Sequence, residues 1–125
     1  MTPKDKQTTN DCHRSHCPVS SFLDILGDKW TLLVVRDMFF GKSTFKELQA
    51  SLEKIPSNIL AERLKRLEAQ DIITRELYQE RPKRYGYHLT DKGRELQPVM
   101  RSLIEWSNKY IPGTYDVEEI EKRLP

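Results

Sequence analysis

Thiols and imidazoles gather in one short stretch of the sequence, CHRSHC, which contains Cys12, His13, His16 and Cys17. Cysteine and histidine are side chains that bind zinc, so the stretch has to be weighed as a metal site. Its spacing is not that of a known zinc finger, and two ligand pairs so close together rarely close a tetrahedron around one ion. We therefore predict no metal here, and no cofactor elsewhere in the chain.

Cys17 has a chemistry of its own, because it stands directly before Pro18 at the expected start of a helix. The dipole at a helix N-terminus lowers the pKa of a thiol and favours the reactive thiolate, and a protonated His16 would assist. The alternative is a half-buried cysteine that packs against the last helix of the domain. The residues alone leave both interpretations open.

Positive charge is concentrated in the segment RPKRYGYHL, which places Arg81, Lys83 and Arg84 within four positions. From Tyr85 onward the segment alternates aromatic and apolar side chains with polar ones, at the period of a strand. Cations at the tip of a hairpin can approach backbone phosphates or reach into the narrower groove of DNA. A basic hairpin tip taken alone is equally typical of solvated surface, so the surrounding elements have to decide.

A polar helix face is expected in residues 57–70, SNILAERLKRLEAQ, whose leucines recur at positions i, i+4 and i+7 and leave the opposite face polar. Asn58 can pair with adenine, and Lys65 or Arg66 with guanine or phosphate. Arg63 lies nearer the boundary of the core. The candidate DNA-contacting residues of this helix are Ser57, Asn58, Glu62, Arg63, Lys65 and Arg66.

Two helices are expected before this face. PVSSFLDILG predicts a helix that begins at a proline and is ended by Gly27. Asp28 can cap a second helix, KWTLLVVRDMFF, before Gly41 stops it. Because its apolar residues run nearly all the way round, this second helix belongs in the centre of a core.

The remaining elements follow in close order. Thr44 and Glu47 have the spacing of a capping box and open a short helix, TFKELQASL, with Thr44 and Lys46 as candidate phosphate contacts. After a tight turn, Ser57 is expected to cap the helix described above. ITRELY and RYGYHL predict two strands joined by the loop QERPK, and Thr90 begins a single last helix that ends near Tyr110.

This order of elements predicts a mainly α protein with a small β-hairpin, an α+β fold of the winged helix-turn-helix type. In that fold a patterned helix enters the major groove and the tip of the hairpin lies beside it. We expect a flexible arm over residues 1–16, a winged helix-turn-helix domain over 17–110 and a tail over 111–125 with one short amphipathic turn. Weighed together with the basic tip, this order favours nucleic acid as the partner.

Composition excludes other classes of protein. The 125 residues fit one domain, and no apolar run is long enough to span a bilayer. The start, MTPKDKQTTND, has no apolar stretch typical of a secretory signal, so we expect a cytoplasmic protein. The net charge is +2, and the acidic last 15 residues leave +4 on the preceding 110. No pattern of nucleophile, base and orienting residue recurs and no glycine-rich phosphate loop is present, so we expect no enzyme.

Several segments resemble one family closely: CPVSSFLDILGDKWTLLVVRDMFFG, FKEL, IPSNILAERLKRLEAQDII and RYGYHLTDKGRELQPVM. The chain resembles the HxlR-type transcription regulators, relatives of the MarR winged-helix repressors, over about residues 17–110. The segments GDKWTLL, NILAERLKRLE and YHLTDKG make the resemblance specific.

The resemblance implies a homodimeric, DNA-binding transcription regulator, and we expect it to act as a repressor. Residues 57–70 would be the recognition helix and residues 81–85 the wing, which comprises Arg81, Lys83, Arg84 and Tyr85. The terminal helices would form the dimer contact. Its candidate residues are Phe22, Leu96, Met100, Leu103, Trp106 and Tyr110.

A signal is implied as well, because Cys17 falls where many members of the family carry a single cysteine. In some members that cysteine senses oxidants, quinones or aldehydes. Cys12 departs from the single-cysteine pattern and leaves open a link between Cys12 and Cys17 or a bond between subunits. The expected signal is a small electrophile or oxidant.

The alternative to DNA binding is a winged helix that contacts another protein through the same helix face and hairpin. Its binding would not depend on the charges of Lys83 and Arg84. Each phosphate contact, by contrast, steepens the dependence of DNA affinity on salt.

Overall fold

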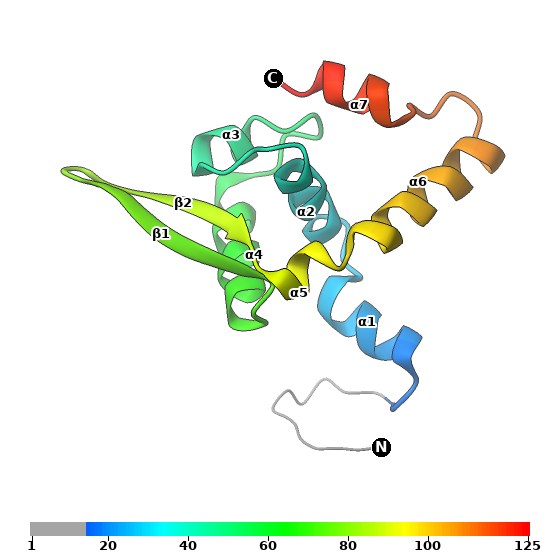
Figure 1. Cartoon of the computed structure of the whole chain (residues 1–125), viewed down its shortest axis with the longest axis horizontal. Coiled ribbons are helices and arrows are strands. Elements are labelled where there is room, and N and C mark those ends of the chain that lie inside the picture. The colour runs from blue at the N-terminus through cyan, green and yellow to red at the C-terminus, as the bar shows by residue number, and fades with distance from the viewer. Residues whose placement is uncertain (1–14) are drawn as a thin grey trace.

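The computed structural model describes residues 15–125, so Cys12 and most of the expected arm lie outside the described residues (Figure 1). The described chain is helical except for one antiparallel hairpin, which confirms the predicted fold class. The helices are α1 (Pro18–Leu26), α2 (Thr31–Phe39), α3 (Phe45–Gln49), α4 (Ser57–Ala69), α5 (Asp91–Arg94), α6 (Gln97–Tyr110) and α7 (Val117–Arg123). The strands are β1 (Ile73–Glu80) and β2 (Lys83–Leu89).

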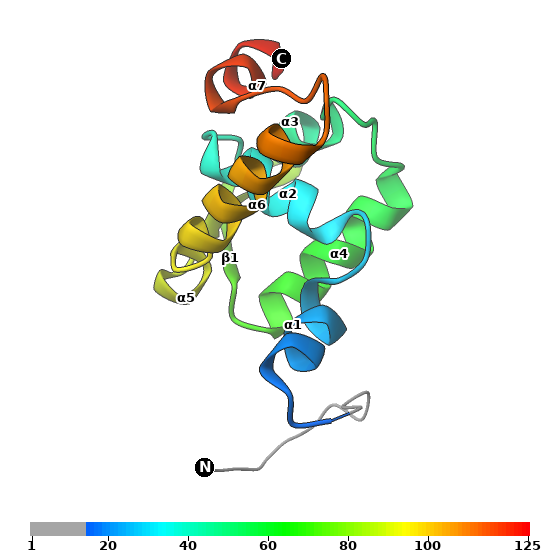
Figure 2. The same cartoon turned by 90° about the vertical axis from the view of Figure 1, so that its right-hand side faces the viewer.

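The core surrounds α2, as its apolar character predicted. Six of the nine residues of α2 are buried, among them Val34, Val35 and Met38. They pack with Leu48 of α3 and with the three buried leucines of α4. Figure 2 shows α2 behind α6, with α3 and α4 close to it. Burial of these side chains, each typically contributing about 1.5–3 kcal/mol, fixes the helix-turn-helix formed by α3 and α4.

The starts of the helices agree with the expected caps in part. Thr44 and Glu47 form the predicted capping box of α3, although this helix ends at Gln49 rather than Leu52. Ser57 was expected as the N-cap of α4, but Pro56 occupies that position and Ser57 is the first helical residue. The prediction was wrong because Pro56 has an extended backbone, which already turns the chain into the helix without a side-chain cap.

The hairpin is longer and tighter than expected. Its strands pair from Ile73 opposite Leu89 to Glu80 opposite Lys83. Only two residues, Arg81 and Pro82, connect the strands, whereas the sequence predicted a loop over residues 79–83. The hairpin projects away from the helices, and its tip is the most remote part of the hairpin from the core (Figure 1).

The base of the hairpin is bonded to the start of α3. The amide of Tyr87 donates to the carbonyl of Ser43 at 2.7 Å, and Thr44 forms a bridge with Gly86. The wing and the first helix of the helix-turn-helix are therefore joined by backbone hydrogen bonds.

The single helix expected from Thr90 to near Tyr110 is divided into two helices, α5 and α6. Thr90 caps α5 through its side chain, which accepts from the amide of Gly93, and the chain then breaks before α6. Pro98, in the first turn of α6, has no amide hydrogen to continue the ladder from α5, so the single helix expected from Thr90 was wrong. Gly93 is packed against the backbone: a Cβ there would lie 2.2 Å from the carbonyl oxygen of Ile72.

The segment after residue 110 contains α7. Asp116 and Glu119 form a capping box at its start, and Ile120 is buried. The sequence predicted only one short amphipathic turn here. The division into an arm, a domain and a tail stays a prediction. The segment assigned to the tail contains the folded helix α7.

Candidate nucleic-acid interface

The outer face of α4 presents the polar residues that the sequence assigned to DNA contact. Ser57, Asn58, Glu62 and Lys65 are exposed, while the leucine stripe on the opposite face is buried. The amides of the first turn have no partner within the helix, and the N-cap, Pro56, supplies no side-chain cap for them. A helix of this kind can bring its N-terminal turn close to a base edge or a phosphate.

The two arginines of α4 are placed differently from Lys65. Arg63 donates from Nε to Asp28 Oδ2 at 2.8 Å and also contacts Glu62. Its side chain is 17% exposed, against 42% for Arg66, which approaches Asp28 Oδ1 at 3.5 Å. The sequence placed Arg63 near the core boundary, which the structure confirms, but gave no sign that Asp28 is its partner.

Asp28 is the electrostatic centre of this cluster. It accepts hydrogen bonds from the amides of Trp30 and Thr31 and from the hydroxyl of Thr31. Partial burial opposes ionisation of Asp28, but the hydrogen bonds from Thr31, Arg63 and Trp30 outweigh it and lower its pKa to about 2. Asp28 was predicted as the cap of a helix starting at Lys29. The helix starts at Thr31, and the carboxylate caps this later turn.

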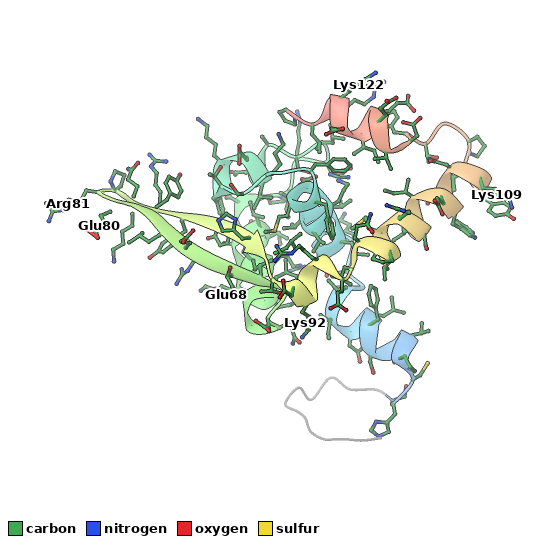
Figure 3. All side chains as sticks on the ribbon, viewed as in Figure 1. Glu68, Glu80, Arg81, Lys92, Lys109 and Lys122 are labelled. Atoms are coloured by element: carbon green, nitrogen blue, oxygen red, sulfur yellow. The ribbon has the colours of Figure 1, made fainter. Side chains whose placement is uncertain are left out.

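The wing presents its cations at the tip of the hairpin. Arg81, Lys83 and Arg84 are all exposed, and Figure 3 shows Arg81 at the tip with Glu80 close by. Tyr85 is half-buried under Arg75, whose guanidinium carbon lies 4.2 Å from the ring centroid. Arg75 was missed by the sequence reasoning. It pairs with Tyr87 in the strand register and covers the ring of the nearby Tyr85, so only the paired hairpin brings these side chains together.

The start of α3 lies beside the base of the wing. The hydroxyl oxygen of Thr44 accepts from the amide of Glu47 at 3.1 Å, so this candidate phosphate contact is also a helix cap. Glu47 accepts from the amides of Ser43 and Thr44, which lowers the pKa of its carboxyl. Lys46 is exposed.

Cys17 is exposed and occupies the N-cap of α1. This differs from the half-buried packing that was one of its two interpretations. Hydrogen bonds from the backbone of Ser20 and Val19 lower the pKa of its thiol, as expected at a helix N-terminus.

The six candidate dimer residues divide into two groups. Phe22, Leu96 and Met100 are half-buried against the core of their own chain. Leu103, Trp106 and Tyr110 are exposed along α6. Val19, Leu23 and Val99, which the sequence did not assign to the dimer contact, are exposed as well, although Leu23 was expected on the buried side of its helix.

Away from the candidate DNA-contacting residues, a cavity of about 930 Å³ lies between α2, α6 and α7. Arg36, on its lining, donates to both carboxylate oxygens of Glu53, at 2.9 and 2.8 Å. This pair ties the connection between α3 and α4 to the central helix. Residues so distant in the chain could not be paired from the sequence.

Two other features are absent from residues 15–125, namely a metal site and a membrane-spanning helix. No group of three side chains suited to hold a metal ion comes together there. No helix in this part of the chain has the length and apolarity needed to cross a membrane.

Comparisons of the sequence with known proteins agree on one kind of protein. A family model described as HxlR-like helix-turn-helix matches residues 25–115. YvaP, an uncharacterized HTH-type transcriptional regulator of Bacillus subtilis (strain 168), is 34% identical over 100 residues, which cover 79% of this chain and 93% of YvaP.

Solved structures agree with this match. The reduced form of the transcriptional regulator YodB from B. subtilis is 32% identical with a TM-score of 0.65, and the match covers 81% of this chain and 100% of YodB. The redox regulator HypR in its oxidized form is 35% identical with a TM-score of 0.68, over 81% of this chain and 100% of HypR.

Proposed function

We propose, from the premise that this chain belongs to the HxlR-like helix-turn-helix family of transcriptional regulators, that it binds specific sequences of double-stranded DNA as a homodimer. It is a regulator and not an enzyme, like the relatives named above. We propose further that it acts as a repressor in the cytoplasm and that an oxidant or small electrophile modifies Cys17 and releases the DNA.

The observation that carries DNA binding is an exposed polar helix face with a basic hairpin fixed beside it. In this arrangement α4 enters the major groove, where Asn58 and Lys65 reach base edges. The wing, residues 81–85, then lies along the flanking backbone, where its cations meet phosphates or enter the narrower groove. Thr44 and Lys46 contact the phosphates that lie between the groove occupied by α4 and the backbone contacted by the wing.

The test is a salt titration with a duplex selected from a random-sequence pool by the purified protein. Replacing Lys83 and Arg84 together with alanine is expected to reduce the slope of log affinity against log salt by about 0.9 for each phosphate that the variant no longer binds. The matched control is Lys122→Ala with Arg123→Ala, an adjacent Lys-Arg pair in α7. Figure 3 shows Lys122 on α7, away from Arg81 at the tip of the hairpin.

The outcomes separate the two classes of partner. An equal slope in the wing variant and the wild type would remove the wing from the DNA contact. If the selection recovers no duplex, the proposed DNA binding fails and the alternative, a winged helix that contacts protein, is favoured.

The homodimer is supported by the apolar side chains that α1 and α6 leave exposed. Two copies related by a two-fold axis would present their α4 helices to half-sites about one helical turn apart, ~34 Å. Sedimentation of the wild type is expected to give a mass of two chains. A monomer at micromolar concentration would contradict this part of the proposal.

The role of Cys17 as a sensor is supported by its exposure, its lowered pKa and its place at the start of α1. The solved structures of HypR and YodB, described as oxidized and reduced forms, favour the same chemistry. A link between Cys12 and Cys17 stays a prediction.

A gel shift tests the sensor directly. The selected duplex is incubated with wild type or Cys17→Ser, before and after treatment with peroxide or a quinone. Treatment is expected to release DNA from the wild type and to leave the variant bound. Equal release from both proteins would remove Cys17 from sensing.

A further inference from the structure

We infer that Asp28 is a positioning residue for DNA reading, which sets the orientation of α4 through Arg63. Arg63 then serves as an internal tie and not as a contact to bases or phosphates. The inference rests on the proposed DNA binding, because it assigns different roles to the cations of the same helix.

Asp28 is fixed from one side by the central helix. Its carboxylate accepts from the amides of Trp30 at 3.1 Å and Thr31 at 3.3 Å, and from the hydroxyl of Thr31. Thr31 is buried and begins α2, the helix at the centre of the core. The carboxylate therefore has little freedom to move relative to the core.

Arg63 reaches the same carboxylate from the other side. The Nε–Oδ2 distance is 2.8 Å, and the side chains of Arg63 and Asp28 are only 17% and 25% exposed. A charged hydrogen bond at this distance is directional and partly shielded from water. It joins residues 35 positions apart and connects α4 to the start of α2.

The leucines of α4 cannot perform this task alone. Leu60, Leu64 and Leu67 hold the helix against the core, but apolar contact is non-directional and tolerates small rotations about the helix axis. A hydrogen-bonded ion pair at the edge of the stripe limits that rotation. Because base contacts need side chains placed to within a fraction of an ångström, a small rotation of α4 would cost specificity before it cost stability.

The other cations of α4 are placed for a different role. Lys65 is exposed, and Arg66 lies 3.5 Å from both Asp28 and Glu62, at the limit of a hydrogen bond. These two side chains remain available to DNA, whereas Arg63 is occupied by the tie. The sequence had assigned all three to DNA contact.

The test replaces Asp28 with asparagine. Because Oδ2 accepts from the Trp30 and Thr31 amides and from Arg63, the variant keeps a neutral oxygen for these donors and removes only the charge that holds the Arg63 guanidinium. Affinity is measured for a duplex selected from a random pool and for a scrambled duplex of the same composition. Asp28→Asn is expected to weaken binding to the selected duplex by about tenfold or more, the scale of a hydrogen bond to a charged group. Binding to the scrambled duplex and the salt slope should stay as in the wild type.

The sign of the effect is decisive. Removing a negative charge beside a DNA-binding helix should by itself strengthen binding to any duplex. The matched control is Asp91→Asn, which makes the same change of charge at an exposed carboxylate of α5 paired with Arg94. An affinity of Asp28→Asn equal to or above that of the wild type would overturn the inference.

A second variant, Arg63→Gln, keeps the result decisive if Asp28→Asn does not fold. It should lose affinity for the selected duplex to the same extent, without a change in salt slope. The double variant should bind no more weakly than either single variant, because each removes the same tie. A slope lowered by about 0.9 in Arg63→Gln would show that Arg63 contacts a phosphate and would refute its role as a tie.

Circular dichroism of every variant distinguishes loss of folding from loss of specific DNA binding. If the selected and scrambled duplexes lose affinity in proportion to the unfolded fraction, Asp28 is only a structural residue and the inference fails. If the wild type selects no duplex, the proposed function fails instead.

Discussion

Helices α2 and α6 contain similar apolar side chains but are covered very differently by their own chain. Val35 of α2 is 0% exposed, and six of the nine residues of that helix are buried. None of the fourteen residues of α6 is buried, and Trp106 and Tyr110 are each 60% exposed. Burial of apolar surface is the main favourable term in folding, so α2 belongs to a closed core within one chain. The apolar side of α6 is left for a second surface to cover.

The comparison separates stability from assembly. We call the region from α2 to β2 the closed half of the molecule, because its apolar side chains are buried within one chain. A change in the closed half should alter the free energy of unfolding of a single chain. A change on the exposed side of α1 or α6 should alter association and leave the isolated chain nearly as stable as before.

The largest effect is expected from Leu60→Ala in α4. Leu60 is 0% exposed, so its truncation removes apolar burial and leaves a cavity, at a cost of about 2–5 kcal/mol in the free energy of unfolding. Urea denaturation followed by circular dichroism measures the loss. Leu103→Ala in α6 is the same chemical change at an exposed site and should cost less than about 0.5 kcal/mol, measured at a concentration where the chain is monomeric. Equal losses in the two variants would erase the contrast between the halves.

A smaller effect, on association, is expected from Trp106→Glu. A charge placed in an apolar contact between subunits should weaken the dimer by about 2 kcal/mol or more, since buried tryptophans often dominate such contacts. Sedimentation at several concentrations measures the shift. Tyr78→Glu on β1 removes a similarly exposed aromatic side chain and serves as the control. Dissociation of both variants to the same degree would mean that α6 is not the contact.

Within the closed half, Thr44→Ala should have an effect of about 1 kcal/mol on unfolding, because it deletes the side-chain cap of α3. Ser57→Ala is the counterpart at the start of α4, where no side-chain cap exists, and should be close to neutral. Thermal unfolding of the two variants measures the difference. A greater loss for Ser57→Ala would contradict the observed start of α4.

The last prediction concerns pH and the link between α4 and the start of α2. The pKa of Asp28 is lowered from 3.8 to about 2, so ionised Asp28 contributes stability above pH 4 that is lost as the pH falls through 2. Unfolding of the wild type should therefore depend more steeply on pH between these values than unfolding of Asp28→Asn. Parallel curves would mean that the carboxylate is not stabilised by its partners.

Much of the fold was predictable because the deciding signals are local. The capping box at Thr44, the leucine spacing of α4 and the alternation before Leu89 each depend on residues a few positions apart. Local signals also misled where a neighbour overrode them, as Pro56 did at the start of α4 and Pro98 did between α5 and α6. The basic wing was found because its three cations lie within four positions of the sequence.

The sequence by itself determined the order of elements from α1 to β2, the polar face of α4 and the family, since these depend on periodicity and on contiguous motifs. Only the tertiary structure decided which cations are occupied and which are available. Arg63 and Lys65 are two positions apart, yet one is tied to Asp28 and the other is exposed. The physical reason is that an ion pair depends on distance in space, and the packing of α4 beside the start of α2 brings together residues 35 positions apart in the chain.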